Sequence, residues 1–489
     1  MSPVVKYASI ECIKYIVESA DLINLFCAIV GADNVLTGEA AAPHCTDWRR
    51  RYTGQALAVV FPSDTQQVAD VVKLCAENNI AIVPQGGNTS QCGGSVPLPK
   101  GEQIVLNLSH MNRIRALDAI DYTMTVEAGC TLALVRETAE KAGRFFPLAL
   151  GLGEDAPQCE IGGNLSTNAG GIAVLRYGTA RSLVLGLEVV LPDGRIWNGL
   201  RGLRKDNTGY NLKHLFIGAE GTLGIITAAV LKLFPLPQSV AMACVAVRDP
   251  AAAVELLAHL RSVCGDRISA FEFISRSCLD LVLQHIPGTH EPFASRHEWI
   301  VLIELSDVLQ VPLDAALYDA LQAFSGIIAS QVSSDKERMK TWWRLRKNIS
   351  EAQKREGISV KHDISVPVSR VSEFITQAEA ALRATFNGIR IVAFGHIGDG
   401  NIHYNVSLHD ALQNPGFIAD SEREVNRIVY DVIAQFNGSI SAEHGVGQLK
   451  REEITCHKSA LELELMRHIK CALDPHGLIN PWKVIPADL

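Results

Sequence analysis

Apolar and polar positions alternate in a way that predicts strand–helix–strand units over the first half of the chain. Ala56–Phe61 and Ile80–Val83 are apolar runs with the length of buried strands. Between them, Pro62 and Ser63 are typical of a helix start, and the valines that follow recur at helical spacing. The other predicted elements are one or two helices within residues 1–50, strands at Ile104–Leu108, Thr123–Glu127 and Gly186–Pro192, and a helix from Thr131 to about Ala142. This order is typical of an α+β domain.

A second unit begins after Pro235 and Pro237, where an apolar strand is predicted at Val240–Val247. From there to about Phe436, strands and helices alternate again. The predicted elements are helices at Val254–Leu260, Leu313–Phe324 and Asp335–Arg355, and strands at Ile300–Leu305, Ser359–Val366, Ile391–Phe394 and Tyr404–Val406. A last helix is predicted from about Ser459 to Leu473.

Three glycine-rich segments interrupt this pattern: Pro84–Pro97, Gly162–Gly171 and Phe216–Thr227. The first contains two glycine pairs, which let the backbone turn its N–H groups inward as a cradle for a diphosphate. It is neither the dinucleotide fingerprint that opens a helix nor a Walker loop. The second is too polar and too rich in glycine for a regular element, and its hydroxyl and amide groups can face a ligand. One such segment can be an ordinary turn, but three together predict one extended nucleotide ligand.

Two imidazoles flank a tight turn in the second unit. His396 and His403 lie at the ends of GHIGDGNIH, between an apolar strand and an alternating one, so both rings can reach one point. Far along the chain, SAEHGVG supplies Glu443 and His444. Two histidines and a carboxylate form a common metal site with open positions for a substrate. The alternative, in which each histidine is a hydrogen-bonded structural residue, stays open on the pattern alone.

The second unit also contains candidate cations for an anionic ligand. Arg346 and Ser350 are four residues apart in the helix predicted over Asp335–Arg355, so they share a face and can meet one ligand. Lys361 lies on the following strand. Arginine can bind a carboxylate through two parallel hydrogen bonds, and lysine adds a point charge. The structural alternatives are a solvated helix face for Arg346 and a surface position for Lys361.

Composition narrows the function class. A hydrophobic content of 47% and a charged content of 20% are typical of a soluble globular protein, and 489 residues suffice for two or three domains. The net charge of −8 argues against a nucleic-acid binder. The twelve cysteines form no Cys-x-x-Cys pair, which favours reduced thiols in the cytoplasm. No apolar run is long enough to span a bilayer.

Four motifs carry a family resemblance: PQGGNTSQCGGSVP, IGGNLSTNAGG, LRKDNTGYNLKHLFIGAEGTLGIIT and DPHGLINPWK. From about residue 50 onward the chain resembles the FAD-linked oxidases, whose first domain has the vanillyl-alcohol-oxidase (PCMH-type) fold. Within this family it is similar to the branch of D-2-hydroxyglutarate and D-lactate dehydrogenases. The resemblance implies an α+β protein with an N-terminal helical segment (1–53), a PCMH-type FAD-binding domain (54–235), a substrate or cap domain (236–437) and a C-terminal segment that returns to the flavin (438–489).

The resemblance also implies which residues hold FAD. The first glycine-rich segment would bind the diphosphate, the second would line the flavin, and the third would hold the adenosine side. The first loop contains no histidine and Cys92 is interpreted as a packing residue, so FAD is expected to be non-covalent. The predicted cofactor residues are Pro84, Gln85, Gly86, Gly87, Asn88, Thr89, Gly93, Gly94, Ser95, Gly162, Gly163, Asn164, Ser166, Thr167, Asn168, Gly170, Gly171, Glu220, Gly221, Gly224, Ile225 and Asn480.

The substrate and metal residues are implied in the same way. A divalent ion, zinc or alternatively manganese, is expected on His396, His403 and Glu443. The residues expected to contact a 2-hydroxy acid are Arg346, Ser350, Lys361, Asn405 and His444, with His444 as the catalytic base. Ser350 stands where human-like members are expected to have threonine, so it keeps the hydroxyl and loses a methyl group. Two cations and a metal suit a dicarboxylate better than lactate.

The implied activity is the flavin-dependent oxidation of D-2-hydroxyglutarate, or of a similar diacid such as D-malate, by hydride transfer to flavin N5. The alternatives are a D-lactate or glycolate dehydrogenase, a metal-dependent hydrolase and a non-catalytic flavin-binding subunit. Electron-transfer flavoprotein or a quinone is the expected electron acceptor, and a homodimer is the expected assembly. The expected compartment is the cytoplasm, or the mitochondrion in a eukaryote.

Overall fold

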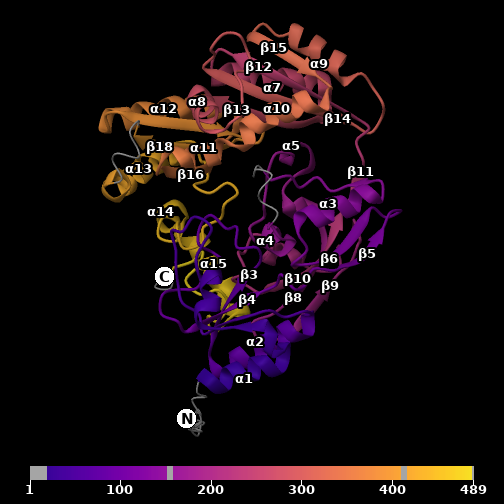
Figure 1. Ribbon diagram of the computed structural model, residues 1–489, viewed down its shortest axis with the longest axis vertical. Coiled ribbons are helices and arrows are strands. Elements are labelled where there is room, and N and C mark those ends of the chain that lie inside the picture. The colour runs from indigo at the N-terminus through magenta and orange to yellow at the C-terminus, as the bar shows by residue number, and fades with distance from the viewer. Residues whose placement is uncertain (1–18, 151–157, 409–415, 487–489) are drawn as a thin grey trace, which may run out of the picture.

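The computed structural model describes residues 19–150, 158–408 and 416–486. Two bodies are visible in Figure 1: a first body in indigo to magenta, and a second body in rose to orange. A yellow C-terminal segment runs back from the second body to the first. Both bodies combine helices with sheets, which confirms the predicted α+β class. Residues 1–18 of the predicted N-terminal segment lie outside the described residues.

The first body begins with a four-stranded sheet that has α1 (Ser19–Val30) and α2 (Thr65–Asn78) packed on it. Asp64 caps α2 by accepting a hydrogen bond from the Gln67 N–H. The strands, in spatial order, are β1 (Val35–Leu36), β2 (Ala58–Val60), β4 (Gln103–Asn107) and β3 (Ala81–Gln85). β2 and β3 both run parallel to β4, so the C-terminal ends of these three strands lie at the same end of the sheet. The first glycine-rich loop begins at this end, directly after β3.

A five-stranded antiparallel sheet completes the first body. Its strands, in spatial order, are β5 (Ile114–Asp118), β6 (Thr123–Glu127), β10 (Ile225–Lys232), β8 (Val184–Val190) and β9 (Ile196–Gly199). The other elements are the helices α3 (Leu132–Lys141), α4 (Ile161–Ser166), α5 (Val174–Tyr177) and α6 (Lys213–Phe216), and the paired strands β7 (Arg144–Phe145) and β11 (Phe234–Pro235). Short 3-10 helices span Ala32–Asn34, Gly38–Cys45 and Ala180–Leu183 in this body, and Gly265–Arg267 and Val368–Arg370 in the second body.

One expectation in this body was wrong. The segment Gly162–Gly171 was predicted to be irregular, but α4 extends through Ser166. Ile161 and Leu165 are four residues apart and both are buried in the core, and this apolar face stabilises a short helix despite two glycines.

The second body is built on a seven-stranded antiparallel sheet. Its strands, in spatial order, are β15 (Ile327–Ser333), β12 (Ser239–Val247), β14 (Trp299–Asp307), β13 (Ile268–Ser275), β17 (Ile389–Gly395), β18 (Asn401–Leu408) and β16 (Val360–Ser365). One face is covered by α7 (Pro250–Cys264), α9 (Leu313–Gln322), α12 (Val371–Thr385) and α13 (Gly416–Gln435), and the other by α8 (Arg276–His285), α10 (Lys336–Lys347) and α11 (Ile349–Glu356). Alternate residues of β12 face the two cores, which explains its unbroken apolar run.

The predicted helix over Asp335–Arg355 is in fact two helices, α10 and α11, which meet at Asn348. The side chain of Asn348 donates a hydrogen bond to the Arg344 carbonyl, 2.9 Å away, and so competes with the helical backbone. Arg346 and Ser350 therefore lie on different helices. Their four-residue spacing does not place them on one helix face.

The C-terminal segment joins the first body. After α14 (Ile454–His457) and α15 (Ala460–Leu473), the Ile82 N–H donates to the Leu478 carbonyl and the Asn480 N–H donates to the Ile82 carbonyl. Residues 478–480 thus add a parallel bridge beside β3. Among the described helices, none combines the length and the apolar character that crossing a bilayer requires.

Candidate active site

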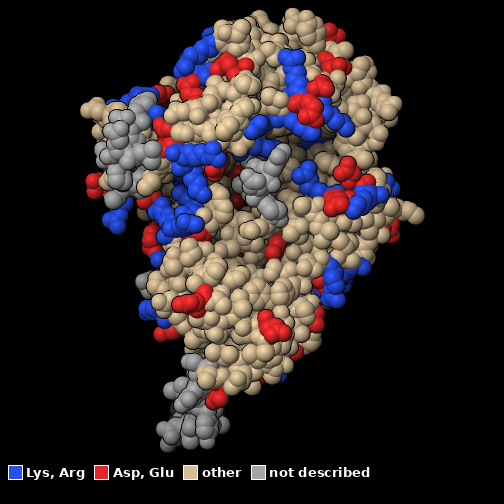
Figure 2. Space-filling view, viewed as in Figure 1, with Lys and Arg blue, Asp and Glu red and all other residues tan. Residues whose placement is uncertain are grey.

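A single large cleft brings together the three glycine-rich segments and the second body. The free space of the cleft is about 1930 Å³ when the solvent at its open mouth is included, and residues of all three glycine-rich segments and of the second body line it. Figure 2 shows Lys and Arg side chains gathered around the hollow between the two bodies, although the chain as a whole is acidic.

Most of the predicted cofactor residues line this cleft. They are Pro84, Gln85, Gly86, Gly87, Asn88, Thr89, Gly94, Ser95, Gly162, Gly163, Asn164, Ser166, Thr167, Gly170, Glu220, Gly221, Gly224 and Ile225. Gly93, Asn168, Gly171 and Asn480 are not among the lining residues and brace the walls instead. Asn480, for example, donates to the carbonyls of Gly94 and Glu220, and the Gly171 N–H donates to the Glu443 carboxylate.

The walls have the properties of a cofactor site. Glu160 Oε2 and Asn164 Nδ2 are buried without a hydrogen-bond partner among the described residues, and both side chains belong to the lining of the cleft. Gly87 approaches so closely that a Cβ there would lie 1.6 Å from the Gln158 carbonyl oxygen. Unpaired polar atoms in the lining suit a polar group such as FAD, and the lack of a side chain at Gly87 lets the first glycine-rich loop pack against Gln158. Glu160 was not predicted; burial raises its pKa to about 8, so the carboxyl can donate a hydrogen bond at neutral pH.

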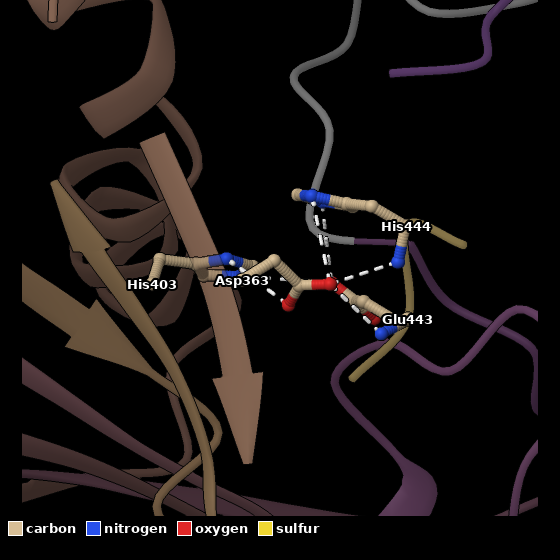
Figure 3. Close-up of side chains that lie close together, drawn as sticks. All are labelled: Asp363, His403, Glu443 and His444. Carbon is tan, nitrogen blue, oxygen red and sulfur yellow. Dashed lines mark hydrogen bonds and ion pairs between the residues drawn. The ribbon is translucent and has the colours of Figure 1, made fainter. Parts of the chain in front are cut away.

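The predicted metal residues lie at the second-body end of the cleft. Glu443 Oε1 lies 3.9 Å from Nε2 of His396, 3.6 Å from Nε2 of His403 and 4.0 Å from Nε2 of His444. Strands β17 and β18 position His396 and His403, while a loop brings Glu443 and His444 from about 40 residues further along. Figure 3 shows Asp363 lying between His403 and the Glu443–His444 pair. Asp363, His403, Glu443 and His444 each offer one ligand atom, and these four atoms lie within 4.8 Å of one another, which is compact enough for a metal ion. The predicted ligand His396 is not part of this group, and it reaches it only through the 3.9 Å contact with Glu443.

Each imidazole also has a buried carboxylate on its Nδ1 side. His396 Nδ1 is hydrogen-bonded to Glu272. Asp363 Oδ1 lies 3.7 Å from His403 Nδ1, and Asp363 Oδ2 lies 3.6 Å from His444 Nδ1. Carboxylates in this position fix the ring orientation of metal-binding histidines. Burial lowers the pKa of His403, which keeps this ring neutral, the form that binds a metal.

Asp363 supports the site from β16. Its Oδ2 accepts hydrogen bonds from the backbone N–H groups of Glu443 and His444, at 2.9 and 2.8 Å, and its Oδ1 accepts one from Asn401. These hydrogen bonds position the loop that carries Glu443 and His444, and Asp363 is itself a member of the candidate ligand group. Burial alone would raise the pKa of Asp363, but its electrostatic interactions with His444, His403 and Lys450 and the hydrogen bond from the Glu443 N–H outweigh burial and lower the pKa.

Glu272 on β13 connects the metal residues with Arg346. Its Oε2 accepts a 2.6 Å hydrogen bond from Arg346 Nε, and its Oε1 bonds to His396. All three side chains are at most 5% exposed. Burial would raise the pKa of Glu272, but the two partners lower it to about 2. Conversely, Glu272 outweighs the effect of burial on His396 and raises the pKa of this imidazole to about 9.

The predicted substrate residues Arg346, Ser350, Lys361, Asn405 and His444 all line the cleft. Arg346 is buried, with its guanidinium 4.9 Å from the Phe394 ring centre, and its Nη2 has no hydrogen-bond partner among the described residues. Lys361 Nζ likewise forms no hydrogen bond or ion pair within the described chain. Neither position matches the structural alternatives of a solvated helix face or a surface strand. Asn405 is braced by the Gln353 side chain and the His362 N–H.

The site contains residues that the sequence analysis missed. Glu272 is the only charged residue in the strand Ile268–Ser275, and a buried charge needs a partner, so a signal was present. Asp363 is two residues from Lys361, which places both on one face of a strand. Arg49, which also lines the cleft, lies in a segment to which the sequence analysis assigned no function.

Comparisons with known proteins agree with this architecture. Residues 236–484 match the family model described as FAD linked oxidases, C-terminal domain, and residues 56–199 match the FAD binding domain model. The chain belongs to the FAD-linked oxidase family. Its fold is that of p-cresol methylhydroxylase, a solved structure with a TM-score of 0.74 and 19% identity, covering 96% of this chain and 97% of that one.

Two relatives extend over nearly the whole chain of this FAD-linked oxidase. The mitochondrial D-2-hydroxyglutarate dehydrogenase of Arabidopsis thaliana is 37% identical over 473 residues, which are 96% of this chain and 82% of that protein. The mitochondrial D-2-hydroxyglutarate dehydrogenase of Bos taurus is 36% identical, over 98% of this chain and 86% of that protein.

Proposed function

We propose that this protein oxidises D-2-hydroxyglutarate, or a similar D-2-hydroxy diacid such as D-malate, to the 2-oxo acid, using FAD and a divalent metal ion. The observation that carries the proposal is the cluster at Glu443, whose Oε1 lies within 4.0 Å of three imidazole Nε2 atoms in the same cleft as Arg346 and Lys361. The names of the two relatives support the choice of substrate.

The glycine-rich segments would hold FAD without a covalent bond, and His396, His403 and Glu443 would hold zinc or manganese. When bound, FAD supplies an acceptor for the hydride from C2. When bound, the metal supplies a Lewis acid that lowers the pKa of the substrate hydroxyl.

His444 is the base in this proposal. Its Nδ1 faces Asp363 Oδ2 at 3.6 Å, so the N–H tautomer at Nδ1 leaves Nε2 free to take the hydroxyl proton. Imidazole has an ordinary pKa close to neutrality, which suits proton transfer near pH 7. The two backbone hydrogen bonds to Asp363 hold the His444 loop in place before the substrate arrives.

The cations orient the substrate. Arg346 shares Glu272 with His396, so its unpartnered Nη2 lies at the metal end of the cleft and can bind the carboxylate next to the reacting carbon. Lys361 would bind the distal carboxylate, while Ser350 and Asn405 would contribute polar contacts. A substrate fixed at both ends presents one face of C2 to the flavin, which accounts for selectivity between the D and L forms.

The reduced protein would pass its electrons to electron-transfer flavoprotein or to a quinone, and a homodimer is the expected assembly. The expected compartment is the cytoplasm, or the mitochondrion if the protein comes from a eukaryote, because the two relatives are named as mitochondrial.

Anaerobic bleaching of the flavin absorbance near 450 nm tests the proposal. D-2-hydroxyglutarate should bleach the yellow protein quickly, the L form should not, and a chelator should prevent bleaching. Bleaching by D-lactate or glycolate alone would instead establish a monoacid dehydrogenase. A colourless protein that binds no flavin would refute the proposal and favour a metal-dependent hydrolase, and a yellow protein that none of these acids reduces would favour a non-catalytic flavin-binding subunit.

A further inference from the structure

Arg49 is a cation in the wall of the cleft that the proposed mechanism does not use. It follows the 3-10 helix Gly38–Cys45 and lines the cleft together with Trp48. Its Nη1 makes one long hydrogen bond, 3.4 Å, to the Gln91 carbonyl, and it forms no ion pair with a carboxylate within the described part of the chain. Burial and the charge of Arg51 lower its pKa, as expected for a guanidinium that lacks a counter-charge.

The two carboxylates whose charges act on Arg49, those of Asp47 and Glu422, form no ion pair with it among the described residues. Asp47 Oδ2 is buried without a hydrogen-bond partner, whereas the other carboxylate oxygens accept hydrogen bonds from other groups. Asp47 Oδ1 accepts hydrogen bonds from the backbone N–H groups of Arg51 and Tyr52, both at 2.7 Å. Glu422 on α13 accepts two hydrogen bonds from the Arg51 guanidinium, at 2.8 and 3.0 Å. The charge of Arg49 is therefore available for a ligand.

These same contacts hold the Arg49 loop in place. The paired hydrogen bonds between Arg51 and Glu422 join the first body to the second. In addition, Lys354 Nζ on α11 lies 5.5 Å from the ring centre of Trp48. Arg49 is thus positioned before any ligand binds.

Lys361 is the neighbour that identifies the ligand. Arg49 and Lys361 line the same cleft, and Lys354 lies against the ring of Trp48, the residue before Arg49. Burial and the positive charges of Arg49 and Lys354 lower the pKa of Lys361 to about 8. Like charges in a buried wall repel each other unless an anion occupies the space between them. Lys361 and Asp363 are two residues apart on β16, which is about 7 Å along the strand. Lys361 is therefore separated from the metal end by about the length of a short dicarboxylate.

We propose that Arg49 and Lys361 together bind the distal carboxylate of the substrate, which makes Arg49 a specificity-determining residue for D-2-hydroxy diacids. The inference rests on the proposed function, because it requires a 2-hydroxy acid whose other end lies at Arg346 and the metal residues. Arg49 lies outside both matched ranges, 56–199 and 236–484, so membership of the family does not imply this role.

Arg49→Gln tests the inference, with Arg50→Gln as the matched control, since Arg50 is the adjacent arginine, is exposed and does not line the cleft. For Arg49→Gln, the second-order rate of anaerobic flavin bleaching by D-2-hydroxyglutarate should fall by about 10- to 100-fold, the range for a hydrogen bond to a charged group. The rate with D-lactate should change far less, so the ratio of the two rates falls. Arg49→Lys should recover part of the loss, and Arg50→Gln should keep the wild-type ratio.

A binding measurement separates this inference from the proposed function. Glutarate keeps both carboxylates and lacks the reacting hydroxyl, and by calorimetry it should bind Arg49→Gln about 10- to 100-fold more weakly than wild type. If D-2-hydroxyglutarate does not bleach the wild-type protein, the proposed function fails, and glutarate binding still decides the role of Arg49. Three results for Arg49→Gln would each overturn the inference. They are an equal fall in the bleaching rates with D-2-hydroxyglutarate and D-lactate, an unchanged affinity for glutarate, or loss of the flavin. The last result would assign Arg49 to the cofactor site.

Discussion

Replacing Glu272 by glutamine removes the carboxylate that lies between Arg346 and His396. Both partners would remain buried, at 3% and 4% exposure, without their counter-charge. Breaking a buried ion pair by removing one member costs about 3–5 kcal/mol. The lowering of the Glu272 pKa from 4.5 to about 2 gives a similar value, about 3 kcal/mol. For a unit of about 200 residues, the melting temperature should therefore fall by about 6–20 °C.

Differential scanning fluorimetry at pH 7 measures this change, with Glu304→Gln as the matched control. Glu304 lies on the neighbouring strand β14 and accepts hydrogen bonds from the neutral groups Ser269 and Trp343, one at each oxygen. In Glu304→Gln the amide oxygen can accept from the Trp343 indole while the amide N–H donates to the Ser269 hydroxyl, so the cost should be small. Because the folded pKa of Glu272 is depressed, its contribution is complete above pH 4.5 and is lost as the pH falls toward 2. The stability difference between wild type and Glu272→Gln should therefore shrink below pH 4.5. A melting temperature for Glu272→Gln within about 2 °C of that for Glu304→Gln would refute the reasoning.

The site supports three further predictions. His444→Gln should keep its flavin but lose turnover by about 10²- to 10⁴-fold, whereas the exposed His476→Gln should not, and near-normal turnover in His444→Gln would remove the base assignment. Asp363→Asn should weaken metal affinity by about 10- to 100-fold, measured by titration with a chelator, and an unchanged affinity would mean that Asp363 does not support the site. Since the pKa of Lys361 is lowered to about 8, its charge is lost as the pH rises through 8, so KM for D-2-hydroxyglutarate should rise above that pH. A parallel rise with D-lactate, or an unchanged profile in Lys361→Gln, would contradict this last prediction.

The sequence predicted the parts of the site that depend on local pattern. Glycine spacing indicated the loops of the cleft, and the turn between His396 and His403 follows from its own residues. The roles assigned to these residues, and the domain boundaries, stay predictions.

The supporting residues were harder to predict because their partners are distant in the chain. Glu272 meets Arg346 across 74 residues, and Asp363 meets the Glu443 amide across 80. No local pattern encodes such contacts, since they depend on the order of strands in the sheet. The break at Asn348 was missed because a capping asparagine looks like an ordinary polar position within an amphipathic run.

The bridge between Ile82 and Ile479 bears on how the protein is made. A ribosome adds about 5–20 residues per second, so residues 478–480 are synthesised about 20–80 s after Ile82. During that interval the edge of the first sheet beside β3 lacks its neighbour, and the Asn480 side chain has not yet reached the Gly94 and Glu220 carbonyls. The wall of the cleft is therefore incomplete on the nascent chain, and we expect stable flavin binding only after this segment has been synthesised.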